Sequence, residues 1–180
     1  GGGPIGWGMT DRVRDKVTGI TITNTAAFEF PTIPWRIAAC RVPYLGALLV
    51  RGANAFVRGA TRMTTEEPLS EAAIEGYCHP YGNWHDRVAV HAFVRDVPMR
   101  SSHKSWYTLK KLEASLPAWR ETPVQIVWGM QDWCFHGKIL QQWEQILPDA
   151  QVHRFEQAGH YLFEEAAEEI IPVIREYLEK

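Results

Sequence analysis

The sequence predicts an α/β protein that contains the C-terminal strands of a parallel sheet, interrupted by an all-helical cap insertion. Two observations lead to this fold class. Apolar or β-branched segments with strand character occur at residues 17–23, 123–129 and 151–155, and a helical pattern separates the last two. From residue 29 to residue 119, in contrast, prolines break the chain into short pieces with helical spacing, and no period-two strand pattern occurs.

The first elements follow from local residue choices. Three glycines precede Pro4, which suits the first turn of a helix because its missing N–H has no partner there. We expect a tight turn at these glycines and a helix to about Val13. The β-branched residues of 17–23 then predict a strand.

The last part of the chain predicts two further strands with helices after them. Behind the strand at 123–129, apolar residues recur on one face of a helix, at Ile139, Leu140 and Trp143. A final helix from about Glu164 contains Pro172, which we expect to kink or divide it.

These elements divide the chain into three parts. Residues 1–28 and 120–180 are expected to form the core, and residues 29–119 the helical cap. Three strands are too few for a sheet covered on both faces, so we expect further strands before Gly1. The exposed sheet edge favours association with that missing N-terminal half, or self-association.

The composition is that of an ordinary globular domain, with 46% hydrophobic residues, 22% charged residues and a net charge of −2. No Lys/Arg block points to nucleic acid or an anionic membrane, and no apolar run reaches the roughly 20 residues of a membrane span. Three scattered cysteines without C-x-x-C spacing predict reduced thiols in a cytoplasmic protein, with no metal and no cofactor. Eight Trp, seven Phe and six Tyr indicate a large core and leave three or four aromatics for an apolar pocket.

Three motifs that are typical of the loop after a strand occur one after another along the chain. They are the glycine turn at residues 1–3, Asp132 just past the second strand, and His160 after the third. Reactive groups in parallel sheets gather at the carboxyl ends of the strands. A carboxylate beside an imidazole fixes its tautomer and stabilises the imidazolium that forms when the ring takes a proton. We therefore predict that Asp132 and His160 lie within hydrogen-bonding distance, as catalytic acid and catalytic base.

Each of these residues has a plainer explanation on its own. An Asp after a strand is commonly a helix N-cap or a turn residue, and Gly-His is a weak signal. Their order, with room for one helix and one strand between them, favours the catalytic interpretation. The other histidines lack such a partner, although His136 is close to Asp132 in sequence.

These motifs resemble the haloalkane dehalogenase branch of the α/β-hydrolase fold. That branch reads Asp-Trp-Gly-Gly-Pro-Ile-Gly from its nucleophile onward, and this chain begins Gly-Gly-Gly-Pro-Ile-Gly. Further likenesses are Asn24-Thr25-Ala26-Ala27-Phe28, Trp128-Gly129-x-x-Asp132, Ala158-Gly159-His160-Tyr161 and Glu164-Glu165. The cap most resembles the β-lactone decarboxylases of bacterial olefin biosynthesis, in segments 34–36, 50–56, 80–84 and 93–98.

The resemblance implies an Asp–His–Asp triad whose nucleophile stands immediately before Gly1, with Asp132 and His160 as the other members. It also implies that the backbone N–H of Gly1 donates to an oxyanion hole. Dehalogenases hold the halide with a Trp where this chain has Gly1, and the difference favours the decarboxylases. The aromatic residues implied to bind a small apolar substrate are Phe28, Trp133, Phe135 and Tyr161.

We therefore expect decarboxylation of a β-lactone to a long-chain alkene. Three alternatives stay open: a haloalkane dehalogenase, a serine esterase with Ser at the place of the nucleophile, and an inactive truncated fragment. We also expect residues 1–180 alone to be inactive, because the nucleophile is not among them.

Overall fold

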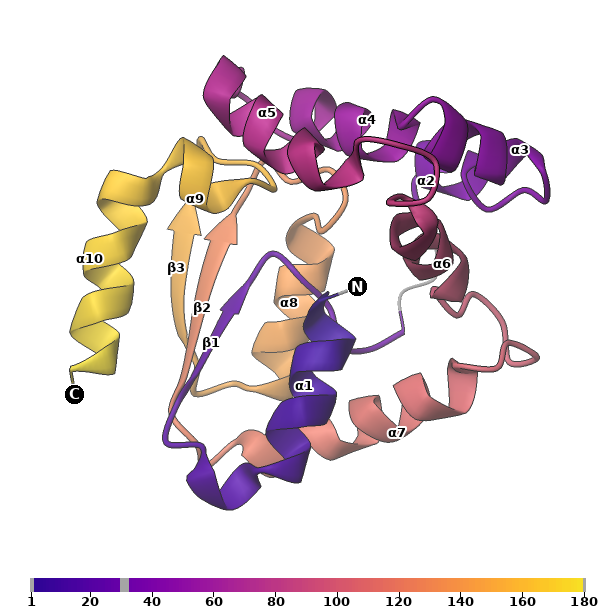
Figure 1. Cartoon of the computed structure of the whole chain (residues 1–180). Coiled ribbons are helices and arrows are strands. Elements are labelled where there is room, and N and C mark those ends of the chain that lie inside the picture. The colour runs from indigo at the N-terminus through magenta and orange to yellow at the C-terminus, as the bar shows by residue number, and fades with distance from the viewer. Residues whose placement is uncertain (1, 30–32, 180) are drawn as a thin grey trace.

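The computed structural model describes residues 2–29 and 33–179, and it contains a three-stranded parallel sheet (Figure 1). The strands are β1 (Ile20–Thr23), β2 (Val124–Gly129) and β3 (Gln151–Phe155), in the spatial order β1-β2-β3. The register places Ile22 beside Ile126, and Ile126 beside Val152. The carboxyl ends of the strands therefore meet at one edge, and the predicted α/β class is confirmed.

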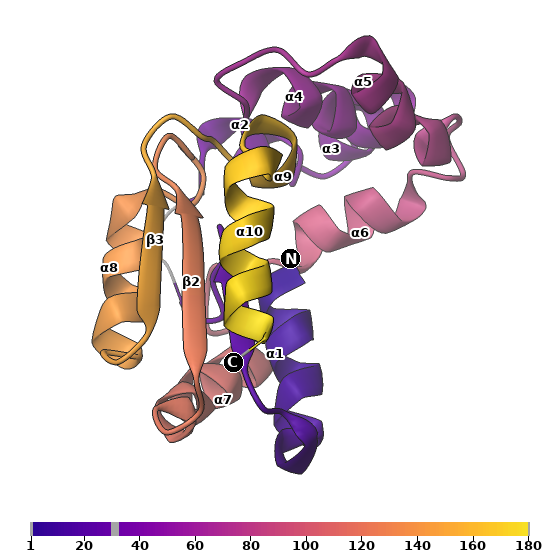
Figure 2. The same ribbon diagram turned by 90° about the vertical axis from the view of Figure 1, so that its left-hand side faces the viewer.

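Helices cover both faces of this sheet. α1 (Gly2–Arg12) and α8 (Gly137–Ile146) lie on one face, and α10 (Ala167–Leu178) lies on the other (Figures 1 and 2). The side chains of β2 alternate between these two layers, so that Ile126 belongs to the core beside α8 and Val127 to the core beside α10. β2 is thus buried along its whole length, as the central strand of the three.

Aromatic side chains fill the core between α1 and α8. The ring of Trp7 lies 5.3 Å from that of Trp143 and 6.1 Å from that of Trp119, between ring centroids. Phe28 packs edge-on against Trp143 at 5.0 Å. Such tilted and edge-on pairs are favoured by the ring quadrupoles. Several of the many aromatic residues of the sequence therefore pack in this core.

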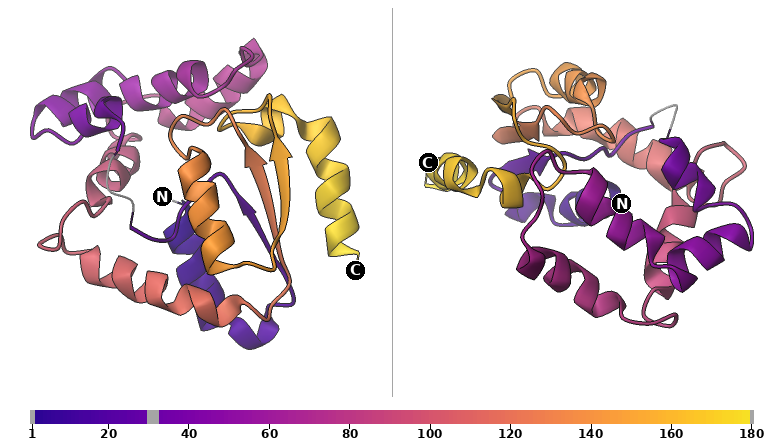
Figure 3. Two further views of the ribbon diagram at one scale, coloured as in Figure 1. Left: turned by 180° about the vertical axis from the view of Figure 1, so that it is seen from behind. Right: turned by 90° about the horizontal axis from the view of Figure 1, so that it is seen from above.

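Helices make up the region between β1 and β2, and its described residues, 33–123, contain no strand. The described part of this region begins with five helices and two short turns. Their bounds are α2 (Trp35–Ala39), α3 (Leu45–Ala47), a π-helical turn (Leu48–Gly52), α4 (Ala55–Met63), α5 (Glu71–Cys78), a 3-10 turn (His79–Tyr81) and α6 (Val88–Asp96). α4 and α5 lie above the carboxyl ends of β2 and β3, whereas α2, α3 and α6 lie to one side of them (Figures 1 and 3).

The next helix, α7 (Trp106–Ser115), lies at the opposite end of the sheet and packs against α1 (Figure 1). A 3-10 turn follows it and buries Leu116 and Trp119 in the core beside α1. On this packing we propose that the cap ends before α7 rather than at Trp119, and that α7 belongs to the core.

The C-terminal helical region is divided at a different place from the one expected. α9 (Leu162–Glu165) is separated from α10 at Ala166, whose φ of −139° is not helical, whereas α10 continues through Pro172. The short helix α9 therefore follows His160 directly. No helix within the described ranges is long and apolar enough to cross a membrane.

Candidate active site

Asp132 lies in the loop between β2 and α8 and is almost completely buried. The backbone N–H groups of Cys134 and Phe135 donate to its Oδ1, at 2.8 and 2.9 Å. An Asp that binds the backbone two and three residues ahead closes a tight loop. The carboxylate is therefore fixed by its own loop, and Oδ2 is left for other partners.

His160 supplies the closest of those partners. Its Nδ1 lies 2.6 Å from Oδ2 of Asp132. The side chain of Asp132 has no exposed surface, whereas 35% of the His160 side chain is exposed. Phe135 stacks on the imidazole, with the ring centroids 5.5 Å apart and the planes 16° from parallel. The structure thus brings together the two residues that the sequence pairs, while their catalytic roles stay predictions.

The charge on Asp132 decides which nitrogen of His160 carries the proton. Burial by itself raises the pKa of Asp132, but the hydrogen bond and charge of His160, with the N–H donors of Phe135 and Cys134, outweigh burial and hold that pKa below its usual value. An ionised carboxylate only accepts hydrogen bonds, so Nδ1 of His160 donates the proton between them. Nε2 then carries a lone pair and can accept a proton.

Asn24, at the end of β1, completes this polar junction, and sequence reasoning assigned it no role. Its Nδ2 donates to Oδ2 of Asp132 and to the carbonyl of Gly129, both at 3.0 Å, and its Oδ1 accepts the N–H of Gly129 at 2.8 Å. Its φ of 21° is positive, a region that Asn enters more readily than most residues. Asn24 therefore joins the ends of β1 and β2 and orients the carboxylate.

The loops after β2 and β3 approach so closely that two positions require glycine. A Cβ on Gly129 would lie 2.3 Å from the carbonyl oxygen of Gly159, and a Cβ on Gly159 would lie 2.7 Å from the carbonyl oxygen of Thr64. The Trp-Gly and Ala-Gly-His motifs thus have a packing reason, because these glycines let the Asp132 and His160 loops meet.

The last residue of α4 and the residue after it, both in the cap, form hydrogen bonds with the His160 loop and the Asp132 loop. The carbonyl of Thr64 accepts the backbone N–H of His160 at 2.8 Å. The carbonyl of Met63 accepts the indole N–H of Trp133, which follows Asp132 directly. Cap and site are therefore joined by hydrogen bonds to main-chain atoms, which no side-chain pattern in the sequence reveals.

Two acidic residues of α9 add to this junction between core and cap. Glu165 accepts the N–H of Gly159 at 3.0 Å through one oxygen and the N–H of Glu66 at 2.7 Å through the other. Glu164 accepts the hydroxyl of Tyr77, on α5, at 3.0 Å. The Glu-Glu pair that the sequence shows after His160 thus fastens the His160 loop to the cap.

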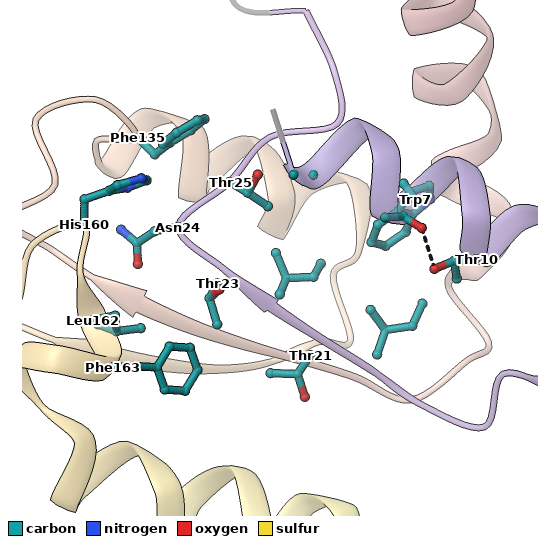
Figure 4. Close-up of a pocket in the computed structure, with 15 residues that line it drawn as sticks. Trp7, Thr10, Thr21, Thr23, Asn24, Thr25, Phe135, His160, Leu162 and Phe163 are labelled. Carbon is teal, nitrogen blue, oxygen red and sulfur yellow. Dashed lines mark hydrogen bonds between the residues drawn. The ribbon is translucent and has the colours of Figure 1, made fainter. Parts of the chain in front are cut away.

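A cavity of ≈ 480 Å³ opens beside His160 and runs along β1, with α1 on one side and α9 on the other (Figure 4). Phe135 and His160 stand at one end, and Leu162 and Phe163 form the wall on the α9 side. In the described part of the chain β1 pairs only with β2, so the cavity follows an open strand edge. No group of three or more His, Cys, Asp and Glu side chains within the described residues is arranged to hold a metal ion.

Phe135 is the one predicted substrate-binding aromatic among the described residues that line this cavity. Phe28 is 1% exposed and lies in the core against Trp143. An aromatic residue in the loop after a strand can pack in the core or line a pocket. The sequence alone does not distinguish these two roles for Phe28. Gly1, the predicted oxyanion donor, lies outside the described residues.

Trp133 and Tyr161 flank the Asp132–His160 pair rather than the cavity. Trp133 is directed to the cap by its indole hydrogen bond. Tyr161 stands edge-on to His160 at 6.0 Å and to Tyr77 at 4.9 Å, between ring centroids, and burial raises the pKa of its hydroxyl. Substrate contact by these two residues stays a prediction.

The sequence pattern of the α/β hydrolase fold matches residues 2–167 of the chain. The match spans the sheet, the cap helices and both residues of the Asp132–His160 pair. The chain therefore belongs to the α/β hydrolase fold family, an enzyme superfamily, and the predicted fold is confirmed.

Two curated relatives share 35% of their residues with this chain. Both are named cis-3-alkyl-4-alkyloxetan-2-one decarboxylase, one from Shewanella oneidensis strain MR-1 and one from Xanthomonas campestris pv. campestris. The matches cover 98% and 99% of this chain, but 57% and 61% of the relatives. The chain thus spans about three fifths of the length of these proteins.

Solved structures of haloalkane dehalogenases have the same fold. DbeA from Bradyrhizobium elkani superposes with a TM-score of 0.85 at 19% identity, over 99% of this chain and 64% of that one. DatA from Agrobacterium tumefaciens superposes with a TM-score of 0.83 at 20% identity, over 99% and 63%. At this identity, the likeness concerns the fold and not the reaction.

Proposed function

We propose that the protein is a cis-3-alkyl-4-alkyloxetan-2-one decarboxylase, which converts a β-lactone with two alkyl chains into an alkene and CO2. The observation that carries this proposal is the 35% identity to two proteins of that name over nearly the whole chain. The cap segments support it from the sequence side, because they resemble the same group. Since the chain covers only part of those relatives, activity and substrate belong to the proposal.

The reaction breaks two bonds of the four-membered ring, C2–C3 and C4–O. The ring carbons C3 and C4 become the alkene, and C2 leaves with both oxygens as CO2. No water is consumed over the whole reaction, in contrast to the hydrolysis of a haloalkane or an ester. A site for this chemistry needs an apolar space for the alkyl chains and a charged group at the ring.

His160 and Asp132 supply the charged part in this proposal. Asp132 keeps the proton on Nδ1 of His160, so Nε2 is the nitrogen that accepts or returns a proton at the substrate. Phe135, stacked on the ring, shields one face of the imidazole from water. We expect the third member of the triad to be the carboxylate that the family resemblance places next to Gly1.

The position of α1 supports that expectation. Gly2 and Gly3, in the first turn of α1, line the same cavity as His160. The N-terminus of a helix favours negative charge, and its free N–H groups stabilise an oxyanion. A carboxylate at that end of α1 would attack C4 of the lactone as the C4–O bond breaks, which gives an ester with the enzyme and a free substrate carboxylate next to Nε2 of His160. Cleavage of the C2–C3 bond then releases CO2, forms the C3–C4 double bond and expels the enzyme carboxylate from C4.

The test is a product assay on the full-length gene product. We expect alkene and CO2 from a synthetic cis-3,4-dialkyl β-lactone and little halide from a 1-haloalkane of equal length. Halide release that clearly exceeds alkene formation would contradict the proposal and indicate a dehalogenase. Ester hydrolysis without either product would indicate a serine-type hydrolase, and no turnover of any substrate would indicate an inactive protein.

Partners and location complete the proposal. We propose that the open edge of β1 pairs with a further strand, from the N-terminal half of the protein or from a second copy. Sedimentation of residues 1–180 tests this, because a compact monomer with a sharp thermal transition would contradict it. The placement in the cytoplasm rests on the reduced state expected of the cysteines and stays a prediction.

A further inference from the structure

A second cavity, of ≈ 410 Å³, lies on the cap, far from the Asp132–His160 pair in the sequence. Its lining residues come from α2 and the turn after it, from the end of α6 and from the loop before α7. Its volume falls in the range of roughly 300–1,000 Å³ that small-molecule sites occupy. The residues that line it are Ala38, Arg41, Val42, Pro43, Arg95, Arg100 and His103.

The described residues that line this cavity thus include three arginines and no acidic residue. Arg41 is anchored, because its Nη1 donates to the carbonyl of Val94 at 2.6 Å. Burial lowers the pKa of Arg41, the like charges of Arg100 and Arg95 lower it further, and the charge of Asp96 offsets only part of this lowering. Like charges held together are unfavourable unless an anion compensates them.

Asp96, whose charge raises the pKa of Arg41, is also engaged by other partners. Asp96 accepts the hydroxyl of Ser105 at 2.8 Å and pairs with Lys104 at 3.2 Å. The ring of His103 is also engaged, since its Nδ1 accepts the N–H of Ser105 at 3.1 Å and its Nε2 lies 3.3 Å from the carbonyl of Arg95. The ring of His103 is thus held by main-chain atoms, and the positive charge of the cavity comes from the arginines.

We propose that this cavity binds the phosphoryl group of an organic phosphate. A phosphate presents three outer oxygens to three guanidinium groups, and the planar fork of Arg matches them with paired hydrogen bonds. A single carboxylate offers only two oxygens and half the charge. Val42 and Pro43 give the cavity an apolar side, which suits the carbon part of a phosphate ester.

Two kinds of molecule carry this group, a soluble phosphate ester and a phospholipid headgroup. Binding is measured calorimetrically with inorganic phosphate and with glycerol 3-phosphate, and by sedimentation with vesicles of phosphatidic acid against vesicles of phosphatidylcholine alone. Tighter binding of the soluble ester assigns a soluble ligand, and binding of phosphatidic acid vesicles assigns the lipid.

The decisive comparison is between two double variants that remove the same charge. Arg95→Gln with Arg100→Gln should weaken phosphate or vesicle binding by about tenfold or more, as expected for the loss of two charge-assisted hydrogen-bond donors. Arg12→Gln with Arg175→Gln, on α1 and α10, should leave binding within about twofold of the original protein. Equal weakening in both double variants, or no saturable binding of any of these ligands to the unaltered protein, would overturn the proposal.

Discussion

Asp132 and His160, the two residues of the predicted catalytic pair, are held in opposite ways. Asp132 belongs to the core, with no exposed side-chain surface and hydrogen bonds from its own loop and from Asn24. His160 lies between core and cap, with its main chain bound to Thr64 and about a third of its side chain exposed. The acid is therefore fixed by the sheet, whereas the base depends on the cap as well.

This difference divides the expected effects of substitution into two kinds. Changes around Asp132 act on the folding of the core and on activity together, because the same hydrogen bonds join strand ends. Changes around His160 act mainly on activity, because its ring contributes little to the core. The predictions for His160, Asn24 and Glu165 separate the two kinds by measuring stability alongside turnover.

The largest effect is expected from His160→Ala. Loss of the proton acceptor should lower kcat by about 10²–10⁴-fold, the usual contribution of a general acid–base group. The melting temperature should change little, since the imidazole is partly exposed. His136→Ala, an exposed histidine at the start of α8, is the matched control and should keep full activity. Equal kcat values for the two variants would refute the assignment of the base.

Asn24→Ala should lower both stability and activity. The substitution leaves the buried N–H of Gly129 without its acceptor and removes one of the two donors to the Gly129 carbonyl, which costs about 1–3 kcal/mol in free energy of unfolding. It also removes one donor from Asp132, so kcat should fall while KM stays nearly constant, as for a positioning residue. Asn83→Ala, in an exposed turn of the cap, should leave kcat unchanged. A variant of Asn24 that is destabilised but fully active would leave it only a structural role.

The pH dependence of stability should carry the signature of Asp132. Its pKa in the folded protein lies below the ordinary value of 3.8, so its contribution is fully present above that value and is lost as the pH falls through the lower, folded pKa. Denaturant unfolding between about pH 5 and pH 2 should therefore show a steeper loss of stability for the unaltered protein than for Asp132→Asn. Parallel curves of stability against pH for the two proteins would mean that the hydrogen bonds of the Asp132 carboxylate do not stabilise the folded protein.

The smallest effect is expected from Glu165→Gln. The amide keeps one acceptor oxygen, so one of the bonds to Gly159 and Glu66 is weakened and the charge is lost. We expect a loss of a few-fold in kcat and less than about 1 kcal/mol of stability. Glu168→Gln, exposed at the start of α10, is the matched control. If the two variants have the same kcat and the same stability, the hydrogen bonds of Glu165 between core and cap do not affect the function of His160.

Strand ends proved to be the most informative feature of the sequence. Parallel strands bring their carboxyl ends together, so the positions of Asp132 and His160 were enough to predict the contact between them. Asn24 stands in an equivalent place, after β1, but an isolated Asn after a strand is typical of a turn. Only the strand order β1-β2-β3, which the sequence does not state, puts it beside Gly129.

Side-chain exposure was harder to predict than position. The apolar spacing of the last helix indicates that Ile170, Ile171 and Leu178 are all buried, yet Ile171 is 48% and Leu178 72% exposed. Only the stripe of α10 that faces β2 is covered, and Ile170 lies on it. The hydrogen bond from the backbone N–H of His160 to the carbonyl of Thr64, in the cap, could not be predicted from the sequence either, because a residue of any type offers the same carbonyl.

The most direct test of the catalytic pair is ¹⁵N NMR of the His160 ring, in the unaltered protein and in Asp132→Asn. We predict a proton on Nδ1 and a strongly hydrogen-bonded N–H signal from it. That signal should be lost or shifted in Asp132→Asn, because the amide no longer holds the ring as a charged acceptor. An unprotonated Nδ1 in the unaltered protein, or identical His160 signals in the two proteins, would contradict the pairing of Asp132 with His160.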